Sequence, residues 1–179
     1  MRNHPQAQLA NGYDARLVAQ LIALQQSAFP PQMQFKDPEA YYREALTDRR
    51  NINLVLRNDR REVTGFLCAL PLASVLTELH PWDPELQDAP GILYVDIIQT
   101  LPGQRQYSGF MGLVAGICRE ATGRDYRRIA MHVRASNGLN RLTMKLFTKS
   151  WCLRRLDNWF GSGESFDYIE AVPCLHRGR

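Results

Sequence analysis

The apolar residues of the N-terminal third of the chain follow a helical period. Asp14 is a suitable N-cap for a helix that runs to about Gln26, and one stripe of this helix is apolar. The stripe consists of Leu17, Leu21, Leu24 and Ala28. Asp37-Pro38-Glu39 supplies the N-cap, first-turn proline and early acidic residue typical of a second helix, which we expect to end near Arg49.

Beyond residue 50 the pattern changes to that of strands. Ile52–Leu56 and Val63–Leu70 are predicted strands, and the polar residues between them predict a hairpin turn. Three prolines make Thr77–Gly91 irregular, and this stretch carries the exposed-looking residues His80 and Trp82.

The rest of the chain alternates strands with helices. Strands are expected at Ile92–Gln99 and Arg128–Val133, with a polar loop at Pro102–Ser108 and a helix at Gly109–Thr122 between them. A second helix, capped by Asn137, is expected to reach about Ser150. A terminal hairpin follows, with its arms at Leu153–Trp159 and Phe166–Val172 and its turn at Gly161-Ser162-Gly163.

The order of elements is therefore (β)ααββ-β-α-β-α-ββ. The central strand–helix–strand requires a parallel pair, whereas the hairpins require antiparallel ones. We expect one domain, residues 1–179, of the α/β (α+β) class, with a single mixed, mostly antiparallel sheet and helices on both faces.

Composition and charge narrow the functional classes. The chain has no stretch of about 20 apolar residues and Met1–Gly12 has no secretory h-region, so we expect no membrane partner and a cytoplasmic location. The net charge is +4, but the arginine pairs are dispersed, which disfavours a nucleic-acid partner. No metal site is expected, because the four cysteines are scattered: Cys68, Cys118, Cys152 and Cys174.

The loop between Thr100 and Gly109 carries the main chemical signal. The first amides of an α-helix have no partner inside the helix and lie at its positive end, which suits a phosphate. The small residues Ser108 and Gly109 allow close approach of the main chain, and Arg105 can add a charge-assisted contact.

The element order and this loop resemble the GNAT superfamily of acyl-CoA-dependent N-acetyltransferases over nearly the full chain. The family motif Gln/Arg-x-x-Gly-x-Gly/Ala matches Gln106-Tyr107-Ser108-Gly109-Phe110-Met111, which follows Thr100-Leu101-Pro102. Met111 departs from it, because the family prefers Gly or Ala there. Reading Arg105-Gln106-Tyr107-Ser108 instead restores the usual distance from Pro102 but loses the glycine, so two registers remain open.

The resemblance implies a GNAT-like fold, acetyl-CoA (coenzyme A) as the cofactor and an amine as the acceptor, and it allows a homodimer. The residues implied to bind the cofactor are Ile98, Gln99, Thr100, Gln104, Arg105, Gln106, Tyr107, Ser108, Gly109, Phe110, Met111, Asn137, Asn140 and Phe147. Asn137 can equally be a plain N-cap. Phe147 stands where many relatives carry the tyrosine that reprotonates the thiolate, so either Tyr107, Tyr168 or water would do so here, or no side chain does.

Asp96 is the candidate base. Strand alternation places it on one face with Tyr94, Ile98 and Thr100, in the middle of an otherwise apolar strand. A buried carboxylate must be paired or face water, so Asp96 is either a base or amine anchor, or a structural residue. We expect Phe29, Trp82 and Tyr94 to contact the acceptor.

The sequence therefore predicts transfer of an acetyl group from acetyl-CoA to a primary amine of a small molecule or protein. The departures at Met111 and Phe147 leave a catalytically silent acyl-CoA-binding module as one alternative. The basic charge leaves a nucleic-acid-binding regulatory domain as another.

Overall fold

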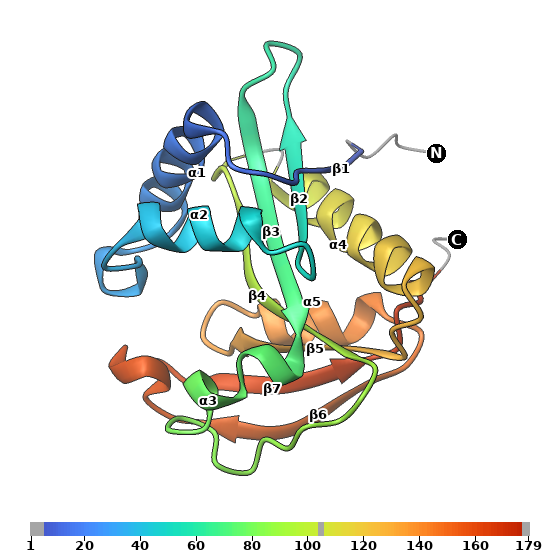
Figure 1. Ribbon diagram of the computed structural model, residues 1–179. Helices are drawn as coiled ribbons and strands as arrows, with labels where there is room; N and C mark the ends of the chain where they lie inside the picture. Colours follow the sequence, from blue (N-terminus) through green and yellow to red (C-terminus); the bar gives the residue numbers. More distant parts are fainter. Residues whose placement is uncertain (1–5, 104–105, 177–179) are drawn as a thin grey trace. The chain divides into compact units, whose positions relative to one another are not determined.

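The structure is a computed structural model that describes residues 6–103 and 106–176 (Figure 1). Its strands are β1 (Gln8–Leu9), β2 (Ile52–Arg57), β3 (Val63–Pro71), β4 (Ile92–Thr100), β5 (Arg128–Arg134), β6 (Ser150–Leu156) and β7 (Phe166–Ala171). Its α-helices are α1 (Ala15–Ala28), α2 (Pro38–Thr47), α3 (Leu76–Leu79), α4 (Gln106–Gly123) and α5 (Leu139–Leu146). Three short 3-10 helices are η1 (Pro31–Met33), η2 (Leu72–Ser74) and η3 (Trp159–Gly161).

The strands form one open seven-stranded sheet in the order β1-β2-β3-β4-β5-β7-β6. β4 and β5 are parallel, with Tyr94 opposite Ala130. The pairs β1–β2, β2–β3, β5–β7 and β6–β7 are antiparallel. The predicted mixed, mostly antiparallel sheet is confirmed.

The chain packs into two compact units. The first comprises the chain up to Ala69 together with Ile97–Ile117, and the second comprises Leu70–Asp96 and the chain from Cys118 onward. β3, β4 and α4 each contribute to both units, and the two units are described separately below.

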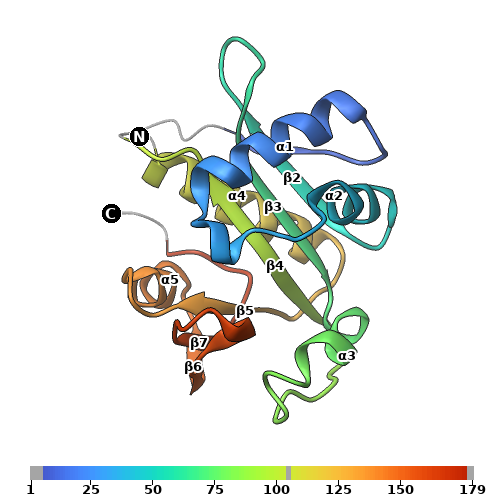
Figure 2. The same cartoon turned by 90° about the vertical axis from the view of Figure 1, so that its left-hand side faces the viewer.

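In the first unit, helices cover both faces of the strands (Figure 2). On one face, Asn53 of β2 donates a hydrogen bond of 2.7 Å to the carbonyl of Ala45 in α2. On the other face, α4 lies so close to β2 that a Cβ at Gly116 would be 3.0 Å from Leu54 Cδ1. Side chains alternate between faces along a strand, so β2 contacts α2 with one set of residues and α4 with the next.

A buried polar contact joins α1, α2 and β4 within the first unit. Gln99 donates to the Tyr42 hydroxyl at 3.1 Å and to the carbonyl of Leu21 at 3.5 Å. Phe66 of β3 meets the Tyr42 ring edge-on at 5.6 Å between centroids. Paired in this way, the polar atoms of Gln99 and Tyr42 can lie in an apolar core at little cost.

The second unit is built on β5 and the β6–β7 hairpin, with α5 packed on these strands. The register places Ala130 opposite Glu170 and His132 opposite Tyr168. Ile129, Ala130, Ile169 and Ala171 are fully buried and form the apolar centre of these strands.

The starts of the two N-terminal helices confirm the sequence prediction, and their ends lie two residues from the predicted ones, at Ala28 and Thr47. Asp14 accepts a hydrogen bond from the amide of Arg16, and Asp37 accepts one from the amide of Ala40. The N-cap positions could be predicted from sequence because a capping side-chain oxygen accepts a hydrogen bond from an amide two or three residues away, without any long-range contact.

Several predicted boundaries are wrong. α4 begins at Gln106 and not at Gly109. Tyr107 is exposed and Ser108 is half-buried, so these positions carry no apolar period that would predict a helix. α5 ends at Leu146 and not near Ser150, because Phe147 is extended (φ −88°, ψ 144°) and pairs with Leu175. Ser150 already begins β6, opposite Ala171.

Two further differences concern short segments. The stretch predicted to be irregular contains the short helix α3. The first arm of the terminal hairpin ends before Trp159, because Asn158 has a left-handed backbone (φ 54°) that a strand cannot contain.

Candidate functional site

In the first unit, the end of β4 leads into the loop that was predicted to bind phosphate. The amide of Leu101 donates to the carbonyl of Thr64 at 2.9 Å, which ties the start of the loop to β3. A Cβ at Gly109 would be 3.4 Å from Thr100 Cγ2 and 3.5 Å from Leu56 Cδ1. The N-terminal turn of α4 therefore lies directly against the end of β4, and a small residue at position 109 permits this approach.

The predicted cofactor residues of this loop are only partly described. Gln104, Arg105 and the side chain of Gln106 lie outside the described residues. Of the others, Tyr107 is exposed and Gly109 is buried, whereas Ile98, Thr100, Ser108, Phe110 and Met111 are half-buried. Gln99 is buried, and its side chain donates to the Tyr42 hydroxyl, so this side chain is already engaged within the protein.

In the second unit, the predicted residues of α5 make contacts of their own. The side chain of Asn137 accepts a hydrogen bond from the amide of Leu139, but the N-cap of α5 is Gly138, so the prediction that Asn137 is the N-cap is wrong by one residue. Asn140 donates to Asp167 at 2.6 Å, and Phe147 is buried. These contacts hold α5 and the start of β6 in place.

Asp96 and Tyr94 lie on β4, at the end of the second unit's share of this strand. Asp96 is exposed, whereas Tyr94 is buried. Ile97 and Gln99, which alternate along the strand with Tyr94, Asp96 and Ile98, are buried. The exposure of Asp96 agrees with the prediction that this carboxylate must be paired or face water.

The Tyr94 hydroxyl leads to a buried polar cluster that the sequence analysis did not find. Tyr94 Oη is 2.9 Å from His132 Nδ1, and His132 Nε2 is 3.1 Å from Asp83 Oδ2. Arg154 Nε donates to Asp83 Oδ1 at 2.7 Å, and Arg154 Nη2 donates to Asp83 Oδ2. The side chains of His132 and Asp83 are only 1% and 0% exposed.

The electrostatics of the cluster fix its protonation. Burial opposes ionisation of Asp83, but the hydrogen bonds from His132 and Arg154 outweigh it and lower the pKa of Asp83 to about 2. Burial lowers the pKa of His132, although Asp83 opposes that shift. At neutral pH the cluster therefore contains a carboxylate and a neutral imidazole.

This protonation state also fixes the direction of the hydrogen bonds. A carboxylate can only accept, so Nε2–H of His132 donates to Asp83. Nδ1 of the neutral ring is then an acceptor, and the Tyr94 O–H donates to it. Burial, with a smaller effect of Asp96, raises the pKa of Tyr94 and keeps its hydroxyl protonated.

Aromatic rings enclose the imidazole. Trp159 stacks on His132 with 3.9 Å between ring centroids, and Tyr168 lies 4.9 Å from it. Tyr168 donates its hydroxyl proton to Glu170 at 3.0 Å, and burial followed by the charge of Glu170 raises its pKa. Tyr168 is therefore a poor proton donor for a leaving group in this conformation.

One signal for the cluster was present in the sequence. His132 interrupts the apolar strand β5 much as Asp96 interrupts β4. Asp83 lies between two prolines in an irregular stretch, 49 residues from His132 in sequence, and no local pattern could have paired them.

The remaining predicted acceptor residues lie in different units. Phe29, in the first unit, is the C-cap that follows α1 and is half-buried, and its amide donates to the carbonyl of Gln25. Trp82, in the second unit, is exposed and stacks on Phe160 with 5.1 Å between ring centroids.

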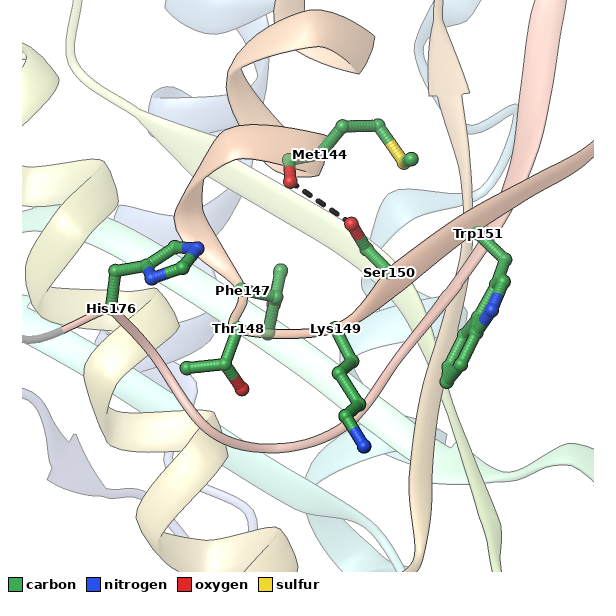
Figure 3. A pocket seen from close by; sticks show the side chains of 7 residues that line it. All are labelled: Met144, Phe147, Thr148, Lys149, Ser150, Trp151 and His176. Atoms are coloured by element: carbon green, nitrogen blue, oxygen red, sulfur yellow. Dashed lines mark hydrogen bonds between the residues drawn. The ribbon is translucent and has the colours of Figure 1, made fainter.

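A separate hollow of about 590 Å³ lies in the second unit, where the chain leaves α5 and enters β6 (Figure 3). Its lining residues are Met144, Phe147, Thr148, Lys149, Ser150, Trp151 and His176. Ser150 Oγ donates to the carbonyl of Met144 at 2.9 Å and closes the turn after α5. Phe147 is the only predicted site residue that this hollow contains.

Within residues 6–103 and 106–176, no cluster of three or more His, Cys, Asp or Glu side chains is suitably placed for a metal ion. No helix in that part of the chain has the length and apolar character needed to cross a membrane.

No protein-family model matches the chain, and no curated protein matches it in sequence. Solved structures do match. An aminoglycoside 6'-acetyltransferase type Ii has a TM-score of 0.68 at 14% identity, over 97% of this chain and 98% of that one. NAA60 of Arabidopsis thaliana in complex with acetyl-CoA has a TM-score of 0.68 at 16% identity, over 96% and 98%. An aminoglycoside 6'-N-acetyltransferase complexed with coenzyme A has a TM-score of 0.66 at 12% identity, over 96% and 99%.

These matches cover nearly the whole of each chain, and their TM-scores of 0.66 to 0.68 indicate the same fold. The low identity limits the likeness to the fold. The chain has the fold of the GNAT superfamily of N-acetyltransferases.

Proposed function

We propose that residues 1–179 form one N-acetyltransferase domain that acts in the cytoplasm and transfers an acetyl group from acetyl-CoA to a primary amine. Two lines of evidence support this. The fold is that of N-acetyltransferases, two of which were solved with coenzyme A or acetyl-CoA. The observation that carries the chemistry is the chain of hydrogen bonds from Tyr94 through His132 to Asp83, close to an exposed carboxylate on the same strand.

The described residues of the loop fit a coenzyme A diphosphate. The close contact between Gly109 and Thr100 leaves the first turn of α4 beside the end of β4, and the positive end of a helix favours an anion. We assign the diphosphate to the first turn of α4, including Tyr107 and Ser108, and to the segment with Gln104, Arg105 and Gln106. The pantetheine arm is assigned to the backbone of Ile98–Thr100. Bound there, acetyl-CoA supplies an activated thioester.

The amine must lose a proton before it reacts, because an alkylamine has a pKa near ~10. We assign Asp96 to hold the ammonium group, since it is an exposed carboxylate on β4. Tyr94 can accept the amine proton on its oxygen while it passes its own proton to Nδ1 of His132. Asp83 then stabilises the imidazolium through Nε2–H, while the Arg154 guanidinium, which shares this carboxylate, opposes the added positive charge.

The bond changes balance with this proton path. The amine nitrogen forms a C–N bond with the acetyl carbon while the C–S bond breaks, and sulfur leaves with the electron pair. A thiolate with a pKa near ~8.5 can take its proton from water. Tyr107 is exposed and is a second donor; Tyr168 would first have to give up its hydrogen bond to Glu170.

Thiol release from acetyl-CoA over a panel of amines tests the proposal, with Asp96→Asn and His132→Gln as variants. His132→Gln keeps an amide that can hydrogen-bond to Asp83 but cannot accept a proton, so we expect kcat to fall by about 10²–10⁴-fold. Asp96→Asn is expected mainly to raise KM, because the anchoring charge is lost. Asp59→Asn, in the exposed turn between β2 and β3, is the matched control and should leave both constants unchanged.

Unchanged kcat in His132→Gln would remove the cluster from the proton path, and unchanged turnover in Asp96→Asn would remove Asp96. The departures at Met111 and Phe147 favour a second candidate, a catalytically silent acyl-CoA-binding module. Binding of acetyl-CoA without thiol release to any amine of the panel would favour that candidate.

A further inference from the structure

Trp82 and Phe160 form an exposed aromatic pair in the second unit. Their rings stack with 5.1 Å between centroids and 28° between planes, and the residues are 38% and 45% exposed. We propose that this pair binds a positively charged group of the acceptor, so that the acceptor is an amine carrying a second cation. The inference rests on the proposed function and names the substrate class for it.

The backbone holds Phe160 outward at a conformational cost. Phe160 has φ 50° and ψ 29°, a left-handed conformation that a bulky residue rarely adopts. Asn158 is also left-handed and accepts hydrogen bonds at 2.9 Å from the amides of Gly161 and Gly163. As a result Trp159 turns inward onto His132 while Phe160 turns outward onto Trp82. The same short turn thus joins the aromatic pair to the proposed proton path.

The two segments that supply the pair are acidic, although the whole chain carries a net charge of +4. Residues 62–104 contain six acidic residues and no lysine or arginine, and residues 156–176 contain four acidic residues and no lysine or arginine. Glu78, Glu85, Asp88 and Asp157 among them are exposed. Asp83, Asp167 and Glu170 of these segments are already paired with Arg154, Arg155 and Arg128. The exposed carboxylates of the two segments, together with the ring faces, favour a cation over an anion.

A comparison with another exposed tryptophan of the chain concerns the cation that each ring meets. Trp151 is also exposed, at 42%, but the guanidinium of Arg128 lies 5.7 Å from its ring centroid. The cation–π contacts found in the part of the chain that the structure describes involve Tyr13, Trp151 and Tyr168, and neither Trp82 nor Phe160. Arg128 gives Trp151 a cation from within the chain. A ligand can give one to Trp82 and Phe160.

Binding can be tested without catalysis. Tetramethylammonium cannot be acetylated, and its titration should quench the tryptophan fluorescence of the full chain in a saturable way. Trp82→Leu and Phe160→Gly should weaken this binding about threefold to tenfold, because each removes one ring of the pair. Phe160→Gly is compatible with the left-handed backbone, and Trp151→Leu is the matched control that should bind as the wild type does.

Kinetics test the substrate class. We expect 1,5-diaminopentane to be acetylated with a KM about threefold to tenfold below that of pentylamine, and Trp82→Leu should abolish this preference. Transfer to both amines with no preference, or a preference that survives in both ring variants, would overturn the inference and leave the proposed function standing. Saturable binding that is lost in the ring variants, with no transfer to any amine, would instead refute the proposed function alone.

Discussion

His132 is the residue on which the proposed chemistry depends. It is almost wholly enclosed, yet it has a hydrogen-bond partner at each ring nitrogen, Tyr94 on one side and Asp83 on the other. A buried imidazole without such partners would be costly, and one with them has a fixed tautomer and orientation. The position of the proton in this cluster therefore follows from the structure.

The same enclosure makes stability depend on pH. Burial lowers the pKa of His132 in the folded chain, whereas in the unfolded chain it is about 6.5. The unfolded state therefore binds a proton that the folded state resists, and the free energy of unfolding falls as the pH drops below about 6.5. The lowered pKa of Asp83 acts in a separate window, because its stabilisation is full above about pH 4 and is lost as the pH falls towards about 2.

Urea unfolding between pH 7.5 and pH 5 measures the contribution of His132. His132→Gln should lose less stability over this range than the wild type does, although it is less stable at pH 7.5. Equal losses in the two proteins would contradict the claim that His132 is buried in its neutral form.

Residue-scale features divide into those that sequence could show and those that it could not. Asp96 was noticeable because a lone carboxylate in an apolar strand is a local anomaly, and in the structure it is exposed. The contacts of Asp83 with His132 and Arg154 join positions far apart in sequence. Such hydrogen bonds produce no periodic pattern of residue types, so the sequence could not predict them. The part played by each residue in catalysis stays a prediction.

At the scale of elements, the elements with local end signals were predicted best. The N-caps at Asp14 and Asp37 fixed the starts of α1 and α2 within the sequence itself. The start of α4 was placed three residues late, and the end of α5 was set by pairing of the following chain with Leu175 and Ala171, which is a tertiary effect.

The packing of α4 against β2 gives a prediction at this scale. A Cβ at Gly116 would be 3.0 Å from Leu54 Cδ1 and 3.1 Å from Ala7 Cβ, whereas nothing lies within 4 Å of a Cβ at Gly123. Gly116→Val should therefore destabilise the protein by about 1–3 kcal/mol through overpacking. Gly123→Ala, at the end of the same helix, should change stability by no more than about 1 kcal/mol. Chemical denaturation of both variants checks this, and equal stabilities would show that α4 does not pack on β2 as closely as described.

At the scale of the whole molecule, the order of helices and strands was enough to predict the fold. The parallel β4–β5 pair, flanked by antiparallel pairs, could be predicted from a strand–helix–strand between hairpins. The solved structures share this arrangement at 12–16% identity, so the fold is specified by the pattern of elements with few shared residues. The acceptor could not be predicted in this way, because its proposed site depends on Trp82 and Phe160, which meet only in the folded second unit.

Calorimetric titration of acetyl-CoA into the wild type and Ser108→Glu tests the central claim most directly. Ser108 lies in the first turn of α4, where a glutamate favours the helix but repels a diphosphate. We predict saturable binding to the wild type, at least about tenfold weaker binding to Ser108→Glu with its stability retained, and unchanged binding to Gln26→Glu, which adds the same charge at an exposed position of α1. No binding to the wild type, or equal affinity in all three proteins, would contradict a coenzyme site at the start of α4.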